Sequence, residues 1–147
     1  MRTTATEITV DATPAQVWAT LTDLPRYCTW NPVVRQAAGE VAVGARLELT
    51  MYAESGKPTV FRPTVLTAVP GAELRWAGRF LVRGLLDTEH WFRLSEGPGR
   101  TTRLEHGERF RGLLAPLLGS RLTGTARNFT PMNEALRTRV ESARSAL

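Results

Sequence analysis

The last third of the chain, residues 112–147, has the pattern of one long amphipathic helix, and this stretch limits the possible folds more than any other. Its apolar residues recur at steps of three and four, which places them in one stripe on a helix surface. They are Leu114, Leu118, Leu122, Ala126, Phe129, Met132, Leu136, Val140 and Ala143. A stripe of this length needs a broad apolar partner, so the sequence predicts a sheet that packs against a terminal helix. Pro131 lies within the stripe and has no backbone N–H to donate, so we expect a kink or a break near residues 128–130.

At 147 residues the chain is long enough for one domain that spans residues 1–147 and buries a core. It has no apolar run long enough to cross a bilayer, and its N-terminal residues lack the apolar core of a signal peptide. The one cysteine, Cys28, has no partner for an internal disulfide. These features predict a soluble, cytoplasmic protein without integral membrane association.

The charge pattern weighs against nucleic acid as a partner. The formal net charge is +5, and Lys57 is the one lysine. The arginines are scattered among acidic and apolar residues, whereas a nucleic-acid-binding face clusters basic residues with stacking aromatics. The two histidines and Cys28 show no metal-ligand spacing, and neither phosphate-binding loop pattern is present. We therefore expect no nucleic acid partner, no metal and no cofactor.

Two short helices are expected to follow a first strand. The segment Glu7–Asp11 alternates like a short strand. A helix then begins after Thr13, a good N-cap, with Pro14 in its first position and Gln16 completing a capping box. Residues 24–32 are bracketed by prolines and have room for one or two helical turns.

From residue 33 to residue 110 the apolar period changes to two, and turns with glycine and proline divide the segment into about six antiparallel strands. Two alternating runs give the strongest inner-face signals: Leu47, Leu49 and Met51, and then Leu74, Trp76 and Phe80. The register of residues 59–69 stays open, because Pro63 favours an edge position or a bulge. Two pairs compete for the inner face there: Val60 with Leu66, and Phe61 with Val65.

Several groups of residues have an order and spacing found in a known superfamily. They are Ile8–Trp18, Trp30–Pro32, Pro70–Gly71 before Leu74–Trp76, and Gly107–Phe110 with Gly112–Leu114. Together with the order of elements, they resemble the START-like superfamily, also called SRPBCC, and its polyketide cyclase/dehydrase and lipid-transport branch. The resemblance implies an α+β helix-grip fold: a curved antiparallel sheet of about seven strands around a long C-terminal helix, with two short helices after the first strand. It also implies a cavity between sheet and helix for an apolar or amphipathic small molecule.

Three polar side chains are expected on the inner face of the sheet. If Phe92 points inward, strand alternation turns His90 inward as well. In the same way, Phe110 brings in His106 and Glu108 on the neighbouring strand. A histidine beside a carboxylate can exchange a proton with a ligand near neutral pH, so His90, His106 and Glu108 are candidate catalytic residues. The alternative is a buried polar cluster whose members satisfy one another.

The candidate ligand-binding residues lie on the inner face of the sheet, on the helix stripe and at Trp30. They are Trp30, Leu49, Met51, Trp76, Phe80, His90, Phe92, His106, Glu108, Leu118, Leu122, Phe129 and Met132. Aromatic and aliphatic side chains of this kind are suited to the wall of an apolar pocket. They also suit an ordinary core, which is the competing interpretation.

We expect the chain to bind or transport a hydrophobic small molecule, lipid-like or polyketide-like, in this cavity. One alternative is an enzyme of the polyketide cyclase or dehydratase type that uses an inward histidine as acid or base. A second is a protein-binding module of the chaperone-activator type. An enzyme should show a histidine facing open space, a carrier a mainly apolar cavity, and an adaptor an exposed apolar patch without a cavity. The ligand, the pathway and the oligomeric state stay open, with a homodimer as one option.

Overall fold

The computed structural model describes residues 1–52, 56–80, 82–117 and 126–145 and shows an α+β fold. The elements in chain order are β1 (Arg2–Val10), α1 (Pro14–Leu21), the 3-10 helix η1 (Leu24–Thr29), β2 (Val34–Ala38), β3 (Glu48–Tyr52), β4 (Pro58–Phe61), β5 (Thr64–Val69), β6 (Glu73–Phe80), β7 (Leu86–Gly97), β8 (Thr101–Arg111) and α3 (Ala126–Ser145). Two short helices follow the first strand, as the sequence predicts.

The described strands form two antiparallel sheets in place of the single sheet of about seven strands that we expected. The larger has the order β1-β8-β7-β6-β5 and the smaller the order β2-β3-β4. An isolated bridge between Arg46 and Thr64 links them. The division falls at Pro63, which lies between β4 and β5, because proline cannot donate to a strand ladder.

Pro63 also settles the register that the sequence leaves open. Residues 59–69 contain two strands that pair with different neighbours: β4 with β3, and β5 with β6. Val65 is buried, whereas Val60 and Leu66 are exposed. Phe61 packs against the core. The pair Phe61 and Val65 therefore takes the inner face.

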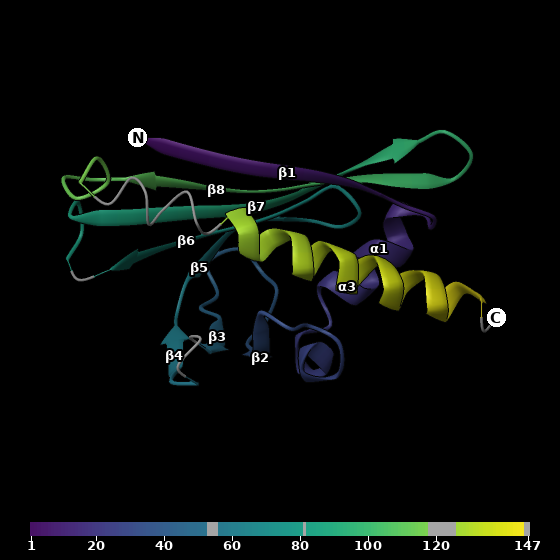
Figure 1. Cartoon of the computed structure of the whole chain (residues 1–147), viewed down its shortest axis with the longest axis horizontal. Helices are drawn as coiled ribbons and strands as arrows, with labels where there is room; N and C mark the ends of the chain where they lie inside the picture. Colours follow the sequence, from purple (N-terminus) through teal and green to yellow (C-terminus); the bar gives the residue numbers. More distant parts are fainter. Residues whose placement is uncertain (53–55, 81, 118–125, 146–147) are drawn as a thin grey trace.

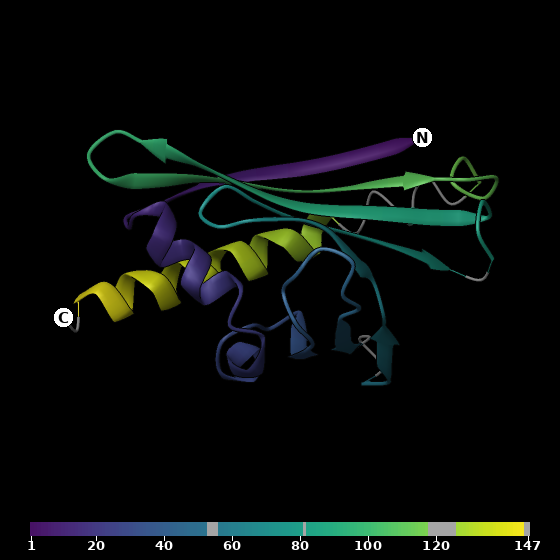
Figure 2. The ribbon, with the colours of Figure 1, turned by 180° about the vertical axis from the view of Figure 1, so that it is seen from behind.

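The helix α3 lies across one face of the larger sheet, and the smaller sheet lies on that same side (Figure 1). Seen from behind, α1 lies beside the C-terminal half of α3 (Figure 2). Phe129, Met132, Leu136 and Val140 of α3 are buried, and the last three belong to the main core cluster. This sheet, gripped against a terminal helix, is the predicted helix-grip arrangement.

The terminal helix differs from the prediction at its start. Residues 113–117 form turns, and the described part of α3 is Ala126–Ser145. Gly112, with φ of 114°, ends β8 in a conformation that favours glycine, and Leu114 N–H then donates to the Leu85 carbonyl. These contacts hold the segment against the loop before β7. The expected stripe residues Leu118 and Leu122 lie outside the described residues.

The helix also continues where a break was expected. Pro131 lies six residues into α3, and helical structure runs on through residues 128–130 and beyond it. Pro131 lies beyond the first four helical positions, so it removes one backbone hydrogen bond from the helix, and the helical structure continues despite this loss. At the other end the stripe is shorter than expected, because Ala143 is exposed.

The local signals for α1 are confirmed. Thr13 is the N-cap, and its hydroxyl accepts from the Gln16 N–H at 3.3 Å. The Gln16 side chain accepts from the Thr13 N–H at 2.9 Å, which completes the capping box. Pro14 occupies the start of the helix, and Val17 and Leu21 are buried.

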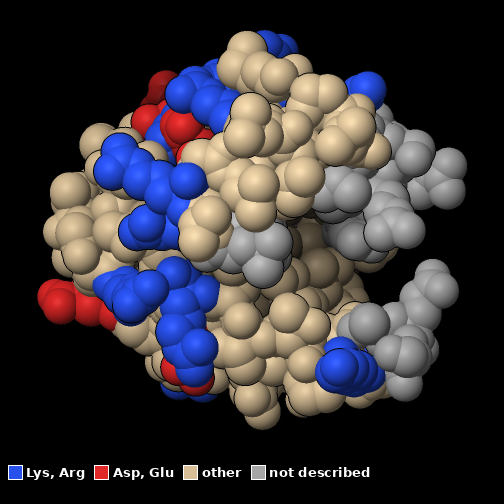
Figure 3. Space-filling model, turned by 90° about the vertical axis from the view of Figure 1, so that its left-hand side faces the viewer, with Lys and Arg blue, Asp and Glu red and all other residues tan. Residues whose placement is uncertain are grey.

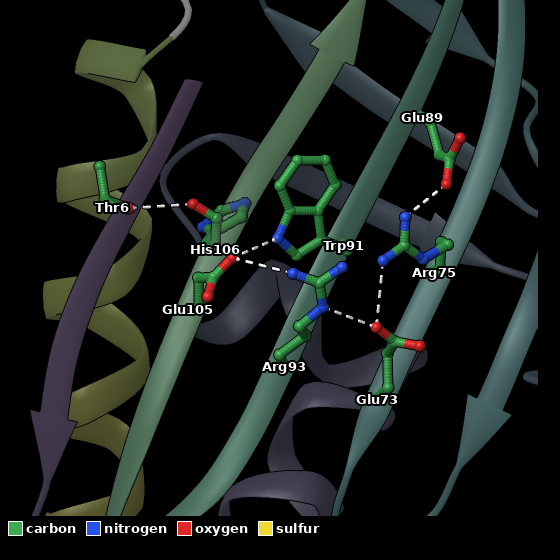
Figure 4. Close-up of polar contacts among 8 residues, drawn as sticks. All are labelled: Thr6, Glu73, Arg75, Glu89, Trp91, Arg93, Glu105 and His106. Carbon is green, nitrogen blue, oxygen red and sulfur yellow. Dashed lines mark hydrogen bonds and ion pairs between the residues drawn. The ribbon is translucent and has the colours of Figure 1, made fainter. Parts of the chain in front are cut away.

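The outer face of the larger sheet contains a buried tryptophan. Alternation predicts Trp91 on this face, either exposed or covering an edge, yet only 2% of it is exposed. Its indole N–H donates to Glu105 at 2.9 Å (Figure 4). Gly107 lies opposite it in β8, and a Cβ there would lie 2.4 Å from the indole ring. The missing side chain therefore makes room for the indole to lie flat on the sheet.

Arginines cover the same ring. The guanidinium groups of Arg75 and Arg93 lie 5.2 Å from the Trp91 ring centroid, and that of Arg109 lies 5.7 Å away. Glu73 accepts hydrogen bonds from Arg93 at 2.9 Å and from Arg75 at 3.1 Å (Figure 4). Burial raises the pKa of the Glu73 carboxyl, but the two arginines outweigh it and hold that pKa below its ordinary value.

Candidate functional site

An apolar cavity of about 180 Å³ lies between the two sheets and α3. Its walls come from the start of β2, from β3, β4, β6, β7 and β8, and from the first turns of α3. They are Val33, Val34, Leu49, Met51, Phe61, Trp76, His90, Phe92, His106, Glu108, Phe110, Phe129 and Met132. Two histidines and one glutamate are the titratable groups among these walls.

Strand and helix periodicity bring these side chains together. His90 and Phe92 are two residues apart on β7, so both point to the inner face. Their partners in the β7–β8 ladder are Glu108 and His106, which makes His90 diagonal to His106. Phe129 lies one helical turn before Met132 and Asn133, so this part of α3 faces the same space. The inward direction that alternation predicts for the three polar residues is confirmed.

Most candidate ligand-binding residues lie in the cavity wall. These are Leu49, Met51, Trp76, His90, Phe92, His106, Glu108, Phe129 and Met132. Trp30 lies outside this wall and packs edge-on against Tyr27, with ring centroids 5.0 Å apart. Leu118, Leu122 and the Phe80 side chain lie outside the described parts of the chain.

Four wall residues were not among the candidates: Val33, Val34, Phe61 and Phe110. Phe110 follows Glu108 by two residues, so alternation was sufficient to find it. Phe61 could not be chosen while the register around Pro63 was open. Val33 and Val34 enter the wall through the turn after η1, where the Asn31 side chain accepts from both backbone N–H groups at 2.9 Å.

His106 is held at the centre of a stack of rings. Its imidazole lies between Phe92 and Phe129, with ring centroids 4.3 Å and 4.2 Å away. Only 1% of the residue is exposed. Its Nδ1 lies 2.7 Å from Asn133 Oδ1, and its Nε2 lies 2.6 Å from His90 Nε2. Both ring nitrogens therefore have partners within the protein, and neither is left for a ligand.

Thr6, Asn133, His106 and His90 form a series of hydrogen bonds, and one backbone carbonyl decides which atom donates in the first of them. The His106 carbonyl can only accept, so the Thr6 hydroxyl donates to it at 3.2 Å (Figure 4). The Thr6 oxygen must then accept from the Asn133 amide N–H at 2.8 Å. Asn133 Oδ1 consequently faces His106 and accepts from Nδ1–H.

The donor and acceptor in the remaining hydrogen bond, between His106 and His90, follow from the charge state of His106. Burial, and then the positive charge of His90, lower the pKa of His106 well below its ordinary value, against the opposing effect of the Asn133 hydrogen bond. A neutral His106 that is protonated on Nδ1 has an acceptor on Nε2, so His90 Nε2–H donates to it. The fixed ring of His106 thus sets the orientation of His90.

The free nitrogen of His90 faces Glu108. Nδ1 lies 3.8 Å from Glu108 Oε2, and both side chains are partly exposed to the cavity. This separation is longer than a hydrogen bond, so a polar ligand atom between the two groups could contact both. His90 also stacks on Trp76, with ring centroids 5.1 Å apart. The cavity therefore has one polar corner, and the rest of its wall is almost wholly apolar.

The described residues show no further chemistry of the common kinds. No three His, Cys, Asp or Glu side chains among them are grouped so as to hold a metal ion. None of the helices in the described ranges has the length and apolar character needed to span a membrane. Cys28 is exposed and forms no disulfide.

Comparison with known proteins relates the chain to one family and one fold. Residues 1–141 match the family model described as "Polyketide cyclase / dehydrase and lipid transport". The chain is similar in structure to protein MLL2253 from Mesorhizobium loti, at 21% identity and a TM-score of 0.76, with 96% of this chain and 98% of that chain covered. It is similar to a START superfamily protein from Mycobacterium smegmatis at 17% identity and a TM-score of 0.71, with 96% and 98% covered.

A third similar structure is the di-domain ARO/CYC protein StfQ of the steffimycin biosynthetic pathway. The identity is 12%, the TM-score is 0.78, and 99% of this chain covers 52% of that chain. The present chain thus spans about half the length of StfQ. A search of curated proteins by sequence found no match.

Proposed function

The chain belongs to the polyketide cyclase / dehydrase and lipid transport family, and from this premise we propose that it binds a hydrophobic small molecule in the cavity between its sheets and α3. The observation that carries the proposal is the cavity itself: thirteen residues from both sheets and the helix surround it, and ten of them are apolar. A ligand there removes apolar surface from water on nearly every side.

The size of the cavity favours a compact ligand. Pockets for drug-sized molecules commonly have volumes of roughly 300–1,000 Å³. At about 180 Å³ this cavity fits a small ring system better than a long acyl chain. Within the lipid-like and polyketide-like classes, the volume supports a ring of the size found in polyketides.

The polar corner, formed by His90 and Glu108, further limits the chemical class of the ligand. His90 Nδ1 and Glu108 Oε2 are 3.8 Å apart, too far for a direct hydrogen bond and close enough for one ligand atom to contact both. A hydroxyl oxygen can accept from one and donate to the other. A ligand carboxylate would meet the charge of Glu108 with only His90 to offset it. We therefore expect a ring that carries a neutral hydroxyl, such as a phenol.

A second candidate function is acid–base catalysis on such a ligand. It is favoured by the position of His90 and Glu108 in the cavity wall, because an imidazole beside a carboxylate can act as acid or base on a bound ligand. In this version His90 touches the substrate and His106 only positions it, since both nitrogens of His106 are occupied. Turnover of small polyketide-like substrates that is lost in His90→Gln, with substrate binding retained, would favour the enzyme over the carrier.

The chaperone-activator alternative receives less support. It predicts an exposed apolar patch in place of a cavity, and the cavity walls are instead largely buried. We keep the cytoplasm as the proposed location, where an exposed free thiol such as that of Cys28 would stay reduced.

The binding proposal is tested by filling the cavity. Leu49 is 2% exposed and lines the wall, so Leu49→Trp should occupy the space and abolish the saturable binding of phenol or indole seen by ligand-observed NMR. Leu66 is 44% exposed, and Leu66→Trp is the matched control with the same side-chain change outside the cavity. Unchanged binding in a folded Leu49→Trp protein would contradict the proposal.

A further inference from the structure

A second hollow opens where β4 separates from β6. The β5–β6 ladder ends at Thr64, opposite Ala77, so in the described structure residues 78–80 continue β6 beyond its last partner in β5. The space between this edge and β4 is a groove of about 640 Å³. Figure 3 views this end of the molecule and shows several basic side chains close together on one part of its face. Phe61 is a wall of both the groove and the cavity.

The groove is strongly basic. Six arginines line it: Arg46, Arg62, Arg79, Arg83, Arg109 and Arg111. The acidic residues of the lining are Asp87 and Glu89: Glu89 pairs with Arg75, which lies outside the lining, and the Asp87 carboxylate accepts from the Gly84 N–H at 3.2 Å. Among the six, Arg62 alone has a described carboxylate within 4.0 Å, that of Glu48 at 3.4 Å. The groove therefore has a surplus of positive charge.

The strand register brings part of this charge together. Asp87 of β7 lies between Arg79 of β6 and Arg111 of β8. Two residues farther along β7 from Asp87, Glu89 lies opposite Arg109 of β8. These outward side chains of three adjacent strands form one side of the groove, so several guanidinium groups face the same space.

One of these arginines has a donor without an acceptor. The Arg109 guanidinium is held over the Trp91 ring, and its Nε is buried with no hydrogen-bond partner in the described parts of the protein. Buried donors are nearly always paired in native proteins, so an unpaired one needs an explanation, and a water or an ion that binds there is one of the ordinary ones. A bound anion at the groove would supply such an acceptor.

We propose that this groove binds a phosphate group, presented either by a soluble phosphate ester or by a lipid headgroup. Phosphate offers several acceptor oxygens and up to two negative charges, which suits guanidinium groups that converge from neighbouring strands. The site is separate from the proposed cavity function, since phosphate binding needs no occupant in the cavity.

The test is a titration of the whole chain with inorganic pyrophosphate at constant ionic strength, followed by two-dimensional NMR. Saturable shifts are expected at the backbone amides of residues 77–89 and 107–111. The variant Arg79→Gln/Arg111→Gln should weaken the affinity on the order of tenfold or more, because it removes two charge-assisted donors. Circular dichroism checks that the variant is folded.

The matched control is Arg103→Gln/Arg139→Gln, which removes the same charge elsewhere. Arg103 lies eight residues before Arg111 on β8, roughly 26 Å away along the strand, and Arg139 is exposed on α3. The control should bind pyrophosphate within about twofold of the wild type. Unsaturable shifts, or equal weakening in both double variants, would overturn the proposal because they indicate a general charge effect.

Vesicles separate the two sources of phosphate. Flotation with phosphatidylcholine vesicles, with and without phosphatidylglycerol, tests a lipid headgroup. Binding that depends on phosphatidylglycerol and on Arg79 and Arg111 assigns the phosphate to a lipid. Pyrophosphate binding without vesicle binding assigns it to a soluble ester. Failure of both assays rejects the site and leaves the cavity proposal untouched.

Discussion

His90 Nε2 lies 2.6 Å from His106 Nε2, and this contact joins the polar corner of the cavity to a hydrogen-bond chain that ends at Thr6 of β1. The chain crosses three elements, because His106 belongs to β8, Asn133 to α3 and Thr6 to β1. It therefore ties the terminal helix to the sheet at the same point where it orients the cavity histidine.

Asn133→Leu should destabilise the fold by about 1–3 kcal/mol, because it leaves the buried His106 Nδ1–H and the Thr6 hydroxyl oxygen without their partner. Urea unfolding measures the change. Glu134→Gln is the control, since Glu134 is a half-exposed neighbour on the same helix, and it should stay within roughly 0.5 kcal/mol of the wild type. A loss in Asn133→Leu as small as in the control would mean that the chain contributes little to stability.

The pH dependence of stability should carry the signature of His106. Burial and the charge of His90 lower its pKa in the folded protein below the ordinary 6.5. Between those two pKa values the unfolded chain binds the proton and the folded chain does not, so stability falls as pH falls below 6.5 and is fully present above it. Glu108 and His90 are the other titratable groups in the wall of the same cavity.

The variant His106→Gln tests whether the pH dependence comes from His106, because it removes that titratable group and leaves the others in place. Urea unfolding at pH values from above 6.5 down to about 5 should give a flatter curve for the variant than for the wild type. Its loss of stability relative to the wild type should shrink as the pH is lowered. Parallel curves for the two proteins would show that His106 is not held neutral by the fold.

Gly107→Ala should destabilise the protein by about 1–3 kcal/mol, because the new methyl group would lie 2.4 Å from the Trp91 ring. A double-mutant cycle with Trp91→Leu tests this cause. In the Trp91→Leu background the indole is gone, so the same glycine change should cost much less. An equal cost in both backgrounds would point to the backbone of Gly107 and not to contact with the ring.

Much of the inner face could be predicted from alternation alone. The period of two predicts that His90, Phe92, His106 and Glu108 point to the inner face, and the structure places all four in the cavity wall. The capping box at Thr13 is equally local and is equally well predicted. Such signals depend on residues close in sequence, where the backbone geometry leaves few alternatives.

The features that the sequence did not reveal depend on contacts between distant segments. The expected first strand began at Glu7, yet β1 begins at Arg2, which brings Thr6 onto the inner face beside Ile8. The inward direction of Asn133 could have been predicted, since it follows Phe129 by four residues on the helix stripe. Its role could be found only once His106 was known to lie against the helix. The burial of Trp91 likewise needed Gly107 as its cross-strand partner.

The cavity is proposed to bind a ring against its apolar wall and to form hydrogen bonds to one hydroxyl of that ring through His90 and Glu108. Isothermal titration with phenol and with anisole tests this proposal most directly, because the two ligands differ in whether they can donate a hydrogen bond. We predict that phenol binds on the order of tenfold more tightly than anisole to the wild type, which corresponds to about one hydrogen bond. In Glu108→Leu this preference should disappear while anisole still binds. Equal affinity of the two ligands for the wild type, or a preference for phenol that survives in Glu108→Leu, would contradict the account.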